Sequence, residues 1–338
     1  MVNYYADKID SLRDLFQADE VCLESRSLVV NGETYPILDD VIILLEPDHY
    51  PQSVKIRLAH KTLQQDSAHE AEDFSLDIQF TFGEEWQRFP EIHQEYDKVF
   101  NEYFDLVDMA SVENKRICDL GCGTGRWSYL LTQKSKPREF VMVDFSEAIF
   151  VARKNLNSVD NVLFFMADIQ CLPFRPDFAD LIFSLGVLHH LPSNALDVVR
   201  NLKTFAPRLL IYLYYSLDNR PFHFRLILSI VTLIRTIVCK VHSRVFRDIF
   251  SWAIAAFVYA PVIWIGRLLD PIGLSRYIPL YAEQHYKSFR WWRLLAYDRF
   301  FTRIEQRVSR KEIMTLEDTF RKVKISPHSS YWHFLCER

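Results

Sequence analysis

The chain has 338 residues, of which 49% are apolar and 25% charged, a composition that supports a real core in one large or two modest domains. Its formal net charge of −4 is unevenly spread: residues 1–110 hold 24 Asp and Glu against 8 Lys and Arg, whereas residues 220–310 hold 5 against 15. Its 6 cysteines are scattered without a C-x-x-C pair, which argues against a zinc site and a disulfide scaffold and suits a reducing cytoplasm. The Asp-rich start does not resemble a signal peptide, so we expect a cytoplasmic protein.

Residues 1–76 form an acidic extension that contains a small β module. Residues 27–30 and 35–38 flank Asn31-Gly32, the dipeptide typical of a two-residue hairpin turn, and a further strand is expected over residues 41–45. The run from Tyr35 to Leu45 resembles the small Trm112-like modules. It departs from them where they carry zinc cysteines, since only Cys22 is present. We therefore expect a module without metal, and an ordinary N-terminal extension is the alternative.

Aromatic and aliphatic residues recur at near-helical spacing between residues 82 and 104, beginning with Trp86 and Phe89. Pro90 interrupts the series, so two helices are expected rather than one. Two hypotheses remain open for this set: a lid over a ligand site, or helices that simply pack on a sheet.

A glycine-rich turn follows the next apolar run. Residues 116–120 predict a buried strand, and the sequence from Asp119 to Gly125, D-L-G-C-G-T-G, places three glycines at alternate positions before a helix. Backbone N–H groups at such a helix start can approach a polar ligand closely. A dinucleotide fingerprint requires a glycine where this chain has Arg126, which disfavours an NAD-type oxidoreductase.

This motif resembles motif I of the class I S-adenosylmethionine (SAM) methyltransferases. The resemblance implies that Asp119 faces the amino-acid end of SAM, and that the turn formed by Gly121, Cys122, Gly123 and Gly125 faces its methionine and ribose portions. It also implies S-adenosyl-L-homocysteine as the product.

A second apolar run, residues 139–143, ends in Asp144 and predicts the next parallel strand. A carboxylate at this strand tip can accept hydrogen bonds from both ribose hydroxyls. Ser146 is the better cap for the following helix, which leaves Asp144 free for the ribose, and Phe145 can stack on adenine.

Two more strands follow in the order that the family requires. Residues 161–167 predict the third strand, after which the resemblance places Asp168 at the adenine amino group and the N–H of Ile169 at the ring. The segment 180–191, D-L-I-F-S-L-G-V-L-H-H-L, is similar to the fourth motif of the family and contains Ser184 and Gly186. The loop after that strand is expected to border the sulfonium and the substrate.

The remaining core elements complete an α/β prediction. Residues 209–214 predict the fifth strand, a capping box begins a helix at Ser309, and residues 323–325 and 331–336 predict two closing strands. We therefore expect a Rossmann-like, doubly wound seven-stranded sheet with an antiparallel last strand, a helical insertion and a small N-terminal β extension. The predicted division is 1–76 for the extension, 77–215 for the SAM-binding core and its preceding helices, 216–308 for the insertion, and 309–338 for the closing elements.

The insertion is apolar and basic. Residues 249–266 contain 18 residues without a charge, a borderline length for a membrane span, but Pro261 and the position inside a folded domain argue against spanning. Arg235 makes residues 222–241 a poor second crossing. Three hypotheses stay open: a buried subdomain or homodimer interface, a lid over an apolar substrate, and a peripheral membrane contact through residues 222–266.

The sequence predicts methyl transfer to a small-molecule or lipid-like, anionic acceptor, and no nucleic-acid partner or metal. Methyl transfer requires mainly alignment and exclusion of water, with a base for a hydroxyl or amine acceptor. Base candidates are His189, His190, Asp298 and Glu305, while Tyr214 at the tip of the fifth strand can orient the acceptor. A non-catalytic scaffold on the same fold is the main alternative, because no base is evident from the sequence alone.

Overall fold

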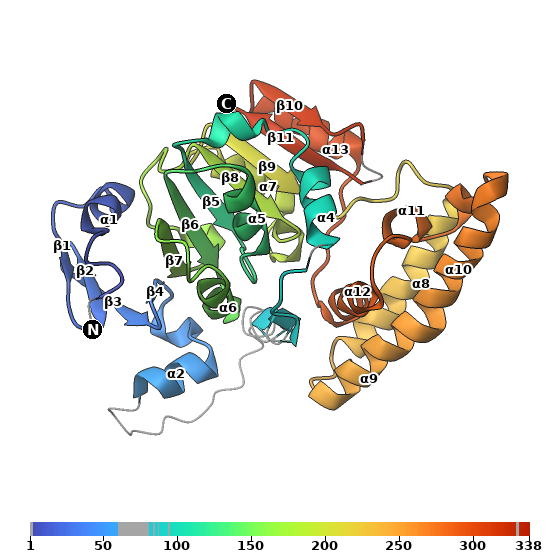
Figure 1. The fold of residues 1–338 in the computed structure, drawn as a ribbon, viewed down its shortest axis with the longest axis horizontal. Helices are drawn as coiled ribbons and strands as arrows, with labels where there is room; N and C mark the ends of the chain where they lie inside the picture. The colour runs from blue at the N-terminus through green and yellow to red at the C-terminus, as the bar shows by residue number, and fades with distance from the viewer. Residues whose placement is uncertain (1–2, 60–80, 84, 87, 94, 329–330) are drawn as a thin grey trace.

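A computed structural model describes residues 3–59, 81–83, 85–86, 88–93, 95–328 and 331–338 (Figure 1). Its centre is one twisted sheet in the order β1-β2-β3-β4-β7-β6-β5-β8-β9-β11-β10. Near-continuous apolar runs form the central strands, as expected where both faces of a parallel sheet are covered. The strands that make up the predicted core are β5 (Arg116–Leu120), β6 (Glu139–Asp144), β7 (Val162–Met166), β8 (Leu181–Leu185), β9 (Arg208–Tyr212), β10 (Lys322–Ile325) and β11 (His333–Glu337).

The order of these seven strands explains where a ligand can bind. β5 pairs in parallel with both β6 and β8, so the chain turns in opposite directions from β5 and creates a topological switch point at its carboxyl end. β11 runs antiparallel between β9 and β10, with Leu335 opposite Leu210. The α/β class and the antiparallel last strand are therefore confirmed.

Helices cover both faces of this sheet (Figure 1). The apolar sides of α4 (Glu95–Tyr103), α5 (Arg126–Lys134) and α6 (Ala148–Asn155) pack on one face. On the other face lie α1 (Ile9–Phe16) and α7 (Ala195–Leu202). Asn194 caps α7 through its side-chain oxygen, which accepts from the N–H groups of Leu196 and Asp197.

The N-terminal strands enlarge the sheet beyond the predicted seven strands. β1 (Val21–Leu23), β2 (Ser27–Val30), β3 (Glu33–Leu38) and β4 (Val41–Ile43) form an antiparallel series, with the expected hairpin between β2 and β3. β4 then pairs in parallel with β7, placing Ile42 opposite Phe165. The prediction of seven strands was wrong in number because an alternating pattern shows which face of a strand is buried but not which strand it joins. α2 (Gln52–Ala59) follows β4.

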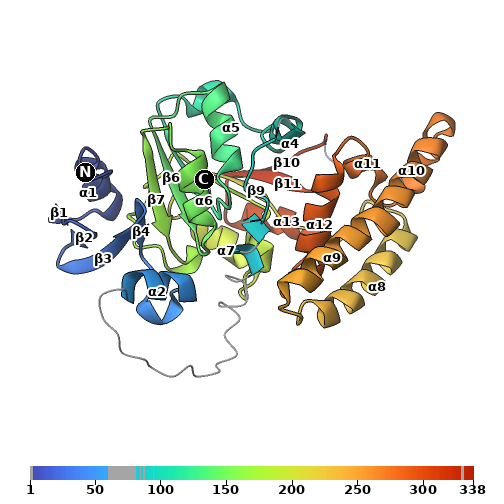
Figure 2. The ribbon, with the colours of Figure 1, turned by 60° about the horizontal axis from the view of Figure 1, so that its bottom comes forward.

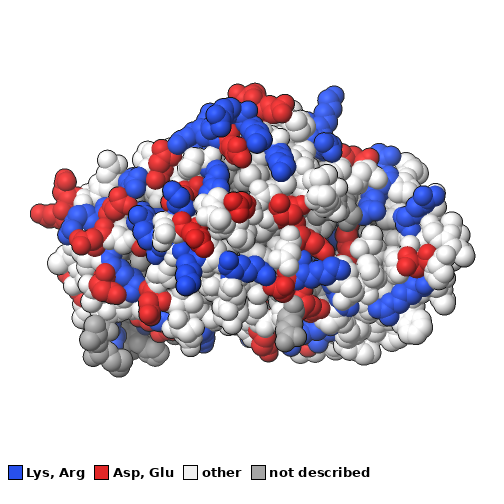
Figure 3. All heavy atoms as spheres, turned by 45° about the horizontal axis from the view of Figure 1, so that its top comes forward, with Lys and Arg blue, Asp and Glu red and all other residues white. Residues whose placement is uncertain are grey.

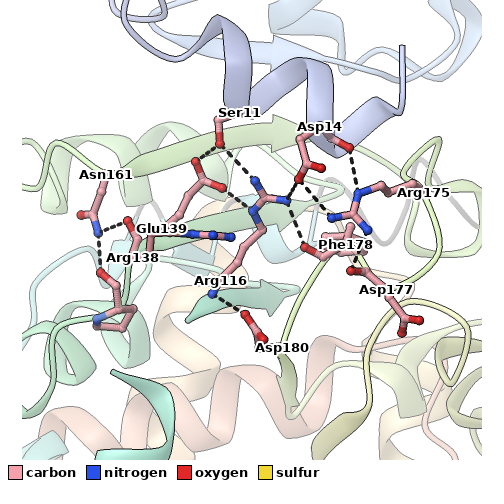
Figure 4. A network of polar contacts seen from close by, with 11 residues as sticks. Ser11, Asp14, Arg116, Arg138, Glu139, Asn161, Arg175, Asp177, Phe178 and Asp180 are labelled. Atoms are coloured by element: carbon pink, nitrogen blue, oxygen red, sulfur yellow. Dashed lines mark hydrogen bonds and ion pairs between the residues drawn. The ribbon is translucent and has the colours of Figure 1, made fainter. Parts of the chain in front are cut away.

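Buried polar contacts bind the N-terminal segment to the core (Figure 4). Arg116, at the start of β5, is 3% exposed and forms ion pairs with Glu139 on β6 and, at 2.6 Å, with Asp14 on α1. Its guanidinium also donates to the carbonyl of Phe178 at 3.2 Å, and its backbone N–H donates to Asp180 at 2.8 Å. A single side chain therefore joins α1 to two central strands.

The insertion is a helical unit at the end of the molecule opposite the N-terminal strands (Figures 1 and 2). Its helices are α8 (Phe222–Val238), α9 (Arg244–Ile254), α10 (Ala260–Leu269), α11 (Tyr281–Gln284) and α12 (Phe289–Phe301). A π-helical turn at Ala255–Tyr259 joins α9 to α10, so the helix continues past Pro261, whose missing N–H and bulky ring are absorbed by the wider turn.

Two contacts close the base of the insertion. Tyr215 and Val308 form a parallel β-bridge, and the N–H of Val308 donates to the carbonyl of Tyr214 at 2.9 Å. α13 (Arg310–Met314) then begins with the predicted capping box between Ser309 and Glu312. The insertion therefore leaves and re-enters the core beside the carboxyl end of β9.

Candidate active site

The glycine turn after β5 is closely packed from both sides. Gly121 has φ +78°, and a Cβ at this position would lie 2.4 Å from a methyl group of Val187. Gly123 has φ +53°, and its added Cβ would lie 3.2 Å from Nε1 of Trp86. These positions need glycine for both conformation and space, so backbone atoms alone form the floor of the site.

The floor opens into a cavity of about 250 Å³ at the switch point of the sheet. Eight of the predicted cofactor residues line it: Gly121, Cys122, Gly123, Asp144, Phe145, Asp168, Ile169 and Gly186. The other three lie behind its wall. Gly125 is the N-cap of α5, the Ser184 hydroxyl donates to the carbonyl of Leu120 at 2.8 Å, and Asp119 is buried beneath the turn.

Asp144 is held firmly at the tip of β6. One carboxylate oxygen accepts from the N–H and hydroxyl of Ser146 at 2.8 and 2.7 Å, and the other accepts from the N–H of Gly123 at 2.8 Å. The expectation that Ser146 would leave Asp144 free was therefore wrong: Ser146 caps the next turn through Ala148 and binds Asp144 as well. The three hydrogen bonds occupy three of the four lone-pair positions of the carboxylate. One position therefore remains for a ligand hydroxyl, whereas two ribose hydroxyls were predicted to bind.

Asp119 has an unusual protonation equilibrium. Its side chain is 1% exposed and accepts a hydrogen bond from the Ser128 hydroxyl at 2.8 Å. Burial raises its pKa to about 8, which the Ser128 hydrogen bond only partly offsets and the neighbouring Asp144 reinforces. The group is therefore largely protonated at neutral pH in the absence of a ligand.

Three of the five residues predicted for catalysis line the same cavity: His190, Tyr214 and Asp298. The Tyr214 hydroxyl donates to one carboxylate oxygen of Asp298, and Nε2 of His190 lies 3.8 Å from the other. The Nδ1 of His190 donates to the carbonyl of Ile304 at 2.8 Å, which fixes the ring with Nε2 toward Asp298. Burial, and next the Asp298 charge, raise the pKa of Tyr214 well above its usual value, so its proton stays in place.

His189 lies behind this cluster rather than in the cavity. Its ring is fully buried and stacks on that of Tyr214, with 3.9 Å between the ring centroids. Burial lowers its pKa well below the usual value, and the neighbouring His190 and Arg307 lower it further. His189 is therefore a neutral packing group that positions Tyr214.

Glu85 is a second carboxyl group in the cavity lining, and no sequence motif singled it out. It is 1% exposed, lines the cavity, and has one oxygen without a hydrogen-bond partner among the described residues. Burial, and next the nearby Asp298, raise its pKa far above the usual value against the opposing effect of Arg126, so Glu85 keeps its proton. Its only sequence signal is a carboxyl group next to Trp86 in an aromatic segment.

Basic side chains that the sequence analysis did not assign also line the cavity. The Arg126 guanidinium lies 4.3 Å from the ring centre of Trp86 and 5.0 Å from that of Trp127. Lys287 has its ammonium 4.2 Å from the ring centre of Trp291, and burial lowers its pKa to about 8. Both basic side chains therefore lie against aromatic rings in the cavity.

The segment before the glycine turn divides between the two proposed roles. Phe82, Glu85 and Trp86 line the cavity, whereas Val99 and Phe100 on α4 pack into the core against the sheet. The lid hypothesis thus describes the first part of this segment, and the packing hypothesis describes the second.

Residues 117–205 match the family model described as "Methyltransferase domain". They span β5 to the segment after α7, which builds the glycine turn and the Asp144, Asp168 and His190 positions. This segment therefore matches a methyltransferase domain. The match agrees with the motif-based prediction of a SAM-dependent methyltransferase.

Two curated relatives are similar over part of this methyltransferase domain. The malonyl-[acyl-carrier protein] O-methyltransferase of Bacillus anthracis is 32% identical over 87 residues, which cover 26% of this chain and 32% of that protein. The enzyme of the same name from Bacillus cytotoxicus is 31% identical over 107 residues, covering 32% and 37%. The chain thus spans about a third of the length of the curated relatives that it matches.

Solved structures of methyltransferases are also similar. One is the SAM-bound magnesium protoporphyrin IX methyltransferase of Synechocystis, which is 20% identical with a TM-score of 0.37. The alignment covers 49% of this chain and 87% of that one.

Proposed function

We propose that this protein transfers a methyl group from SAM to a small-molecule or lipid-like acceptor that binds between the glycine turn and α12. The observation that carries the proposal is one cavity whose lining includes both Gly121 and Gly123, which we assign to a cofactor end, and Asp298, which we assign to an acceptor end. Such a cavity allows donor and acceptor to meet in line while water is excluded.

The residues at the first end fit the cofactor. The glycine floor leaves space that any side chain would fill, and Asp144 retains one acceptor position for a ribose hydroxyl. Phe145 lines the same end and can stack on an adenine ring. When bound there, SAM supplies an activated methyl group with a neutral leaving group.

The second end fits an acceptor with an apolar body and an anionic group. Its lining includes Tyr212, Tyr331 and, from α12, Trp291, Leu294 and Leu295. Lys287 supplies positive charge beside Trp291 of this surface, and Arg126 supplies it beside Trp86 in the same cavity. A carboxylate or phosphate attached to a hydrocarbon group would satisfy both features.

Asp298 is the base that this arrangement favours for a hydroxyl or amine acceptor. One oxygen is occupied by the Tyr214 hydroxyl, and the other points toward His190 and can take the proton of the acceptor. Glu85 holds its own proton and therefore does not compete as base. Asp298 would take the acceptor proton as the acceptor oxygen or nitrogen bonds to the methyl carbon, while the bond from that carbon to sulfur breaks and S-adenosyl-L-homocysteine leaves.

The test combines a binding measurement with an activity measurement. Calorimetric titration with SAM should show micromolar affinity, lost in Asp144→Ala, and titration with NAD should show none. Undetectable SAM binding to the intact protein would refute the proposal.

The purified protein is then incubated with methyl-labelled SAM and fractionated lipids, sugars and small acids. Because the two curated relatives are named for malonyl-[acyl-carrier protein], acyl carboxylates form a separate arm. Label in an apolar acid or lipid fraction is expected. SAM binding without label transfer to any fraction would favour the non-catalytic scaffold.

A further inference from the structure

The insertion exposes a large apolar surface. Of the 21 large apolar side chains exposed among the described residues, 20 lie between Phe222 and Phe289, and the remaining one is Ile56. Water-soluble monomers rarely leave so many large apolar side chains exposed in one region, so this concentration indicates a contact surface.

The exposed side chains form stripes on helices whose opposite sides face the protein. On α8, Leu226, Ile230, Leu233 and Ile237 are 53–67% exposed, whereas Phe224 and Arg235 are buried. On the helix from Arg244 to Ile272, Ile249, Trp252, Trp264 and Leu268 are 47–72% exposed. We call these two stripes together the outer face of the insertion.

The other side of both helices is already occupied by α12, with which α8 and α9 make their main helix contacts (Figures 1 and 2). Ala255, Tyr259 and Ile263 form a small core there with Trp292 and Ala296 of α12. The outer face therefore points away from the methyltransferase domain.

The charge on this unit is positive. Residues 222–277 contain seven Lys and Arg against Asp248 and Asp270, and Asp248 is neutralised by Arg88 and Arg293 at 2.8 and 2.6 Å. Within the part of the chain that the structure describes, Arg225, Lys240, Arg267 and Arg276 form no ion pair, and all four are exposed. Figure 3 shows this end of the molecule as broad uncharged areas interrupted mainly by basic side chains.

We propose that the outer face of the insertion docks on the surface of an anionic lipid bilayer. Apolar side chains with two exposed tryptophans would enter the interface between headgroups and acyl chains, and the basic residues would meet the lipid phosphates. A second copy of the chain fits less well, because pairing two such faces would bring basic groups of the same sign together.

The geometry favours lying on the membrane over crossing it. Among the described residues, the helix Arg244–Ile272 is long and apolar enough to span a membrane. Core helices of soluble proteins meet the same criterion. The inner side of this helix is covered by α12. A span would carry the arginines of α12 into hydrocarbon, at high cost. Only the outer face is available, as in an interfacial helix.

Docking would place the bilayer one helix away from the cavity. α12 contacts α8 and α9 and also contributes Trp291, Leu295 and Asp298 to the cavity. A lipid-like acceptor could then be drawn from the membrane, a consequence that rests on the proposed function, whereas the docking itself does not.

The test is cosedimentation of the full chain with vesicles of phosphatidylcholine, alone or in equal parts with phosphatidylglycerol. Strong binding to the anionic vesicles, weakened by salt, is expected. The double variant Ile249→Glu/Leu268→Glu should lower the partition coefficient about tenfold or more, since both side chains lie on the outer face. Ile56→Glu, an exposed isoleucine on α2, is the matched control and should bind as the wild type does.

A second measurement avoids introducing charged residues into the outer face. Lipids brominated in their acyl chains should quench part of the wild-type tryptophan fluorescence, and Trp252→Phe/Trp264→Phe should lose that part. SAM affinity, measured in parallel, reports on the proposed function separately.

Three results would overturn the docking proposal. The first is no binding to either vesicle, and the second is equal binding by wild type and double variant. The third is a wild-type dimer that the double variant converts to a monomer without vesicle binding, which would assign the face to a second copy.

Discussion

At the scale of single residues, the site is a set of groups whose protonation depends on burial. Burial keeps the carboxyl groups of Asp119 and Glu85 protonated, whereas one oxygen of the Asp298 carboxyl group accepts a hydrogen bond from the Tyr214 hydroxyl. The same chemical group thus has different roles a short distance apart, because desolvation and neighbouring charges differ.

Asp298→Asn should lower the rate of label transfer about 100- to 10,000-fold for a hydroxyl or amine acceptor, because the amide cannot take a proton. Tyr214→Phe, which removes only the donor to Asp298, should cost about tenfold. SAM affinity should be unchanged in both. Glu317→Gln, on the exposed surface, is the control, and a full rate in Asp298→Asn would assign the base elsewhere.

Asp119→Asn should change the pH dependence of stability in the ligand-free protein. An ordinary carboxyl loses its proton near pH 4 when unfolded, whereas folded Asp119 keeps it up to a pKa of about 8. Between these values the unfolded state binds fewer protons, so this group makes the wild type less stable as pH rises, and the effect levels off above the folded pKa.

The variant lacks this contribution. Its stability relative to wild type should therefore increase by about 1 kcal/mol per pH unit between about pH 5 and pH 8, measured by urea unfolding at each pH. A difference between variant and wild type that does not vary with pH would contradict the raised pKa.

At the scale of elements, polar contacts decide where the N-terminal strands and α1 attach. The hairpin of β2 and β3 follows from its local Asn-Gly turn, but it joins the central sheet only through β4, which pairs with β7. Arg116 on β5 also holds α1 to the central sheet. It pairs with Asp14 on α1 and with Glu139 on β6 (Figure 4).

Arg116→Ala should lower the free energy of unfolding by about 3–5 kcal/mol, because Glu139 would remain buried without its cation. Arg13→Ala, which breaks an exposed pair with Asp10 on the same α1, should cost less than about 1 kcal/mol. Both values come from urea unfolding. Equal, small effects would show that the Arg116 network does not hold α1 to the sheet.

At the scale of the whole molecule, the insertion is linked to the cavity wall through buried charges. Arg235 on α8 lies 3.1 Å from Glu305, which also pairs with Arg307. Burial opposes ionisation of Glu305, but Arg307, Arg235 and Arg299 together hold its pKa below the usual value. Glu305 is thus an ionised structural group, and the neighbouring Gln306 donates its N–H to the carbonyl of His189 at 2.9 Å.

Arg235→Ala should destabilise the protein by about 3–5 kcal/mol and also weaken label transfer, because Glu305 would lose a partner beside the catalytic wall. Arg225→Ala, on the exposed side of the same helix, should change stability by less than about 0.5 kcal/mol. Thermal unfolding and the label assay check both. A stable, fully active Arg235→Ala protein would show that α8 and the cavity are independent.

The sequence by itself determined the features that depend on local pattern. Apolar runs, turn residues and caps predicted the central strands, the hairpin and the start of α13, and the glycine spacing located the ligand turn. These features are readable because strand burial, positive φ and capping each restrict the residues at a few adjacent positions.

Only the tertiary structure decided what depends on contacts between distant residues. It joined β4 to β7, brought Glu85 and Lys287 into the cavity, turned Arg235 inward to Glu305, and left the outer face of the insertion exposed. An apolar helix has the same local pattern whether a core, a second copy or a membrane covers it. Only the packing shows which side is covered: α12 packs on one side of the insertion helices, and the other side faces solvent.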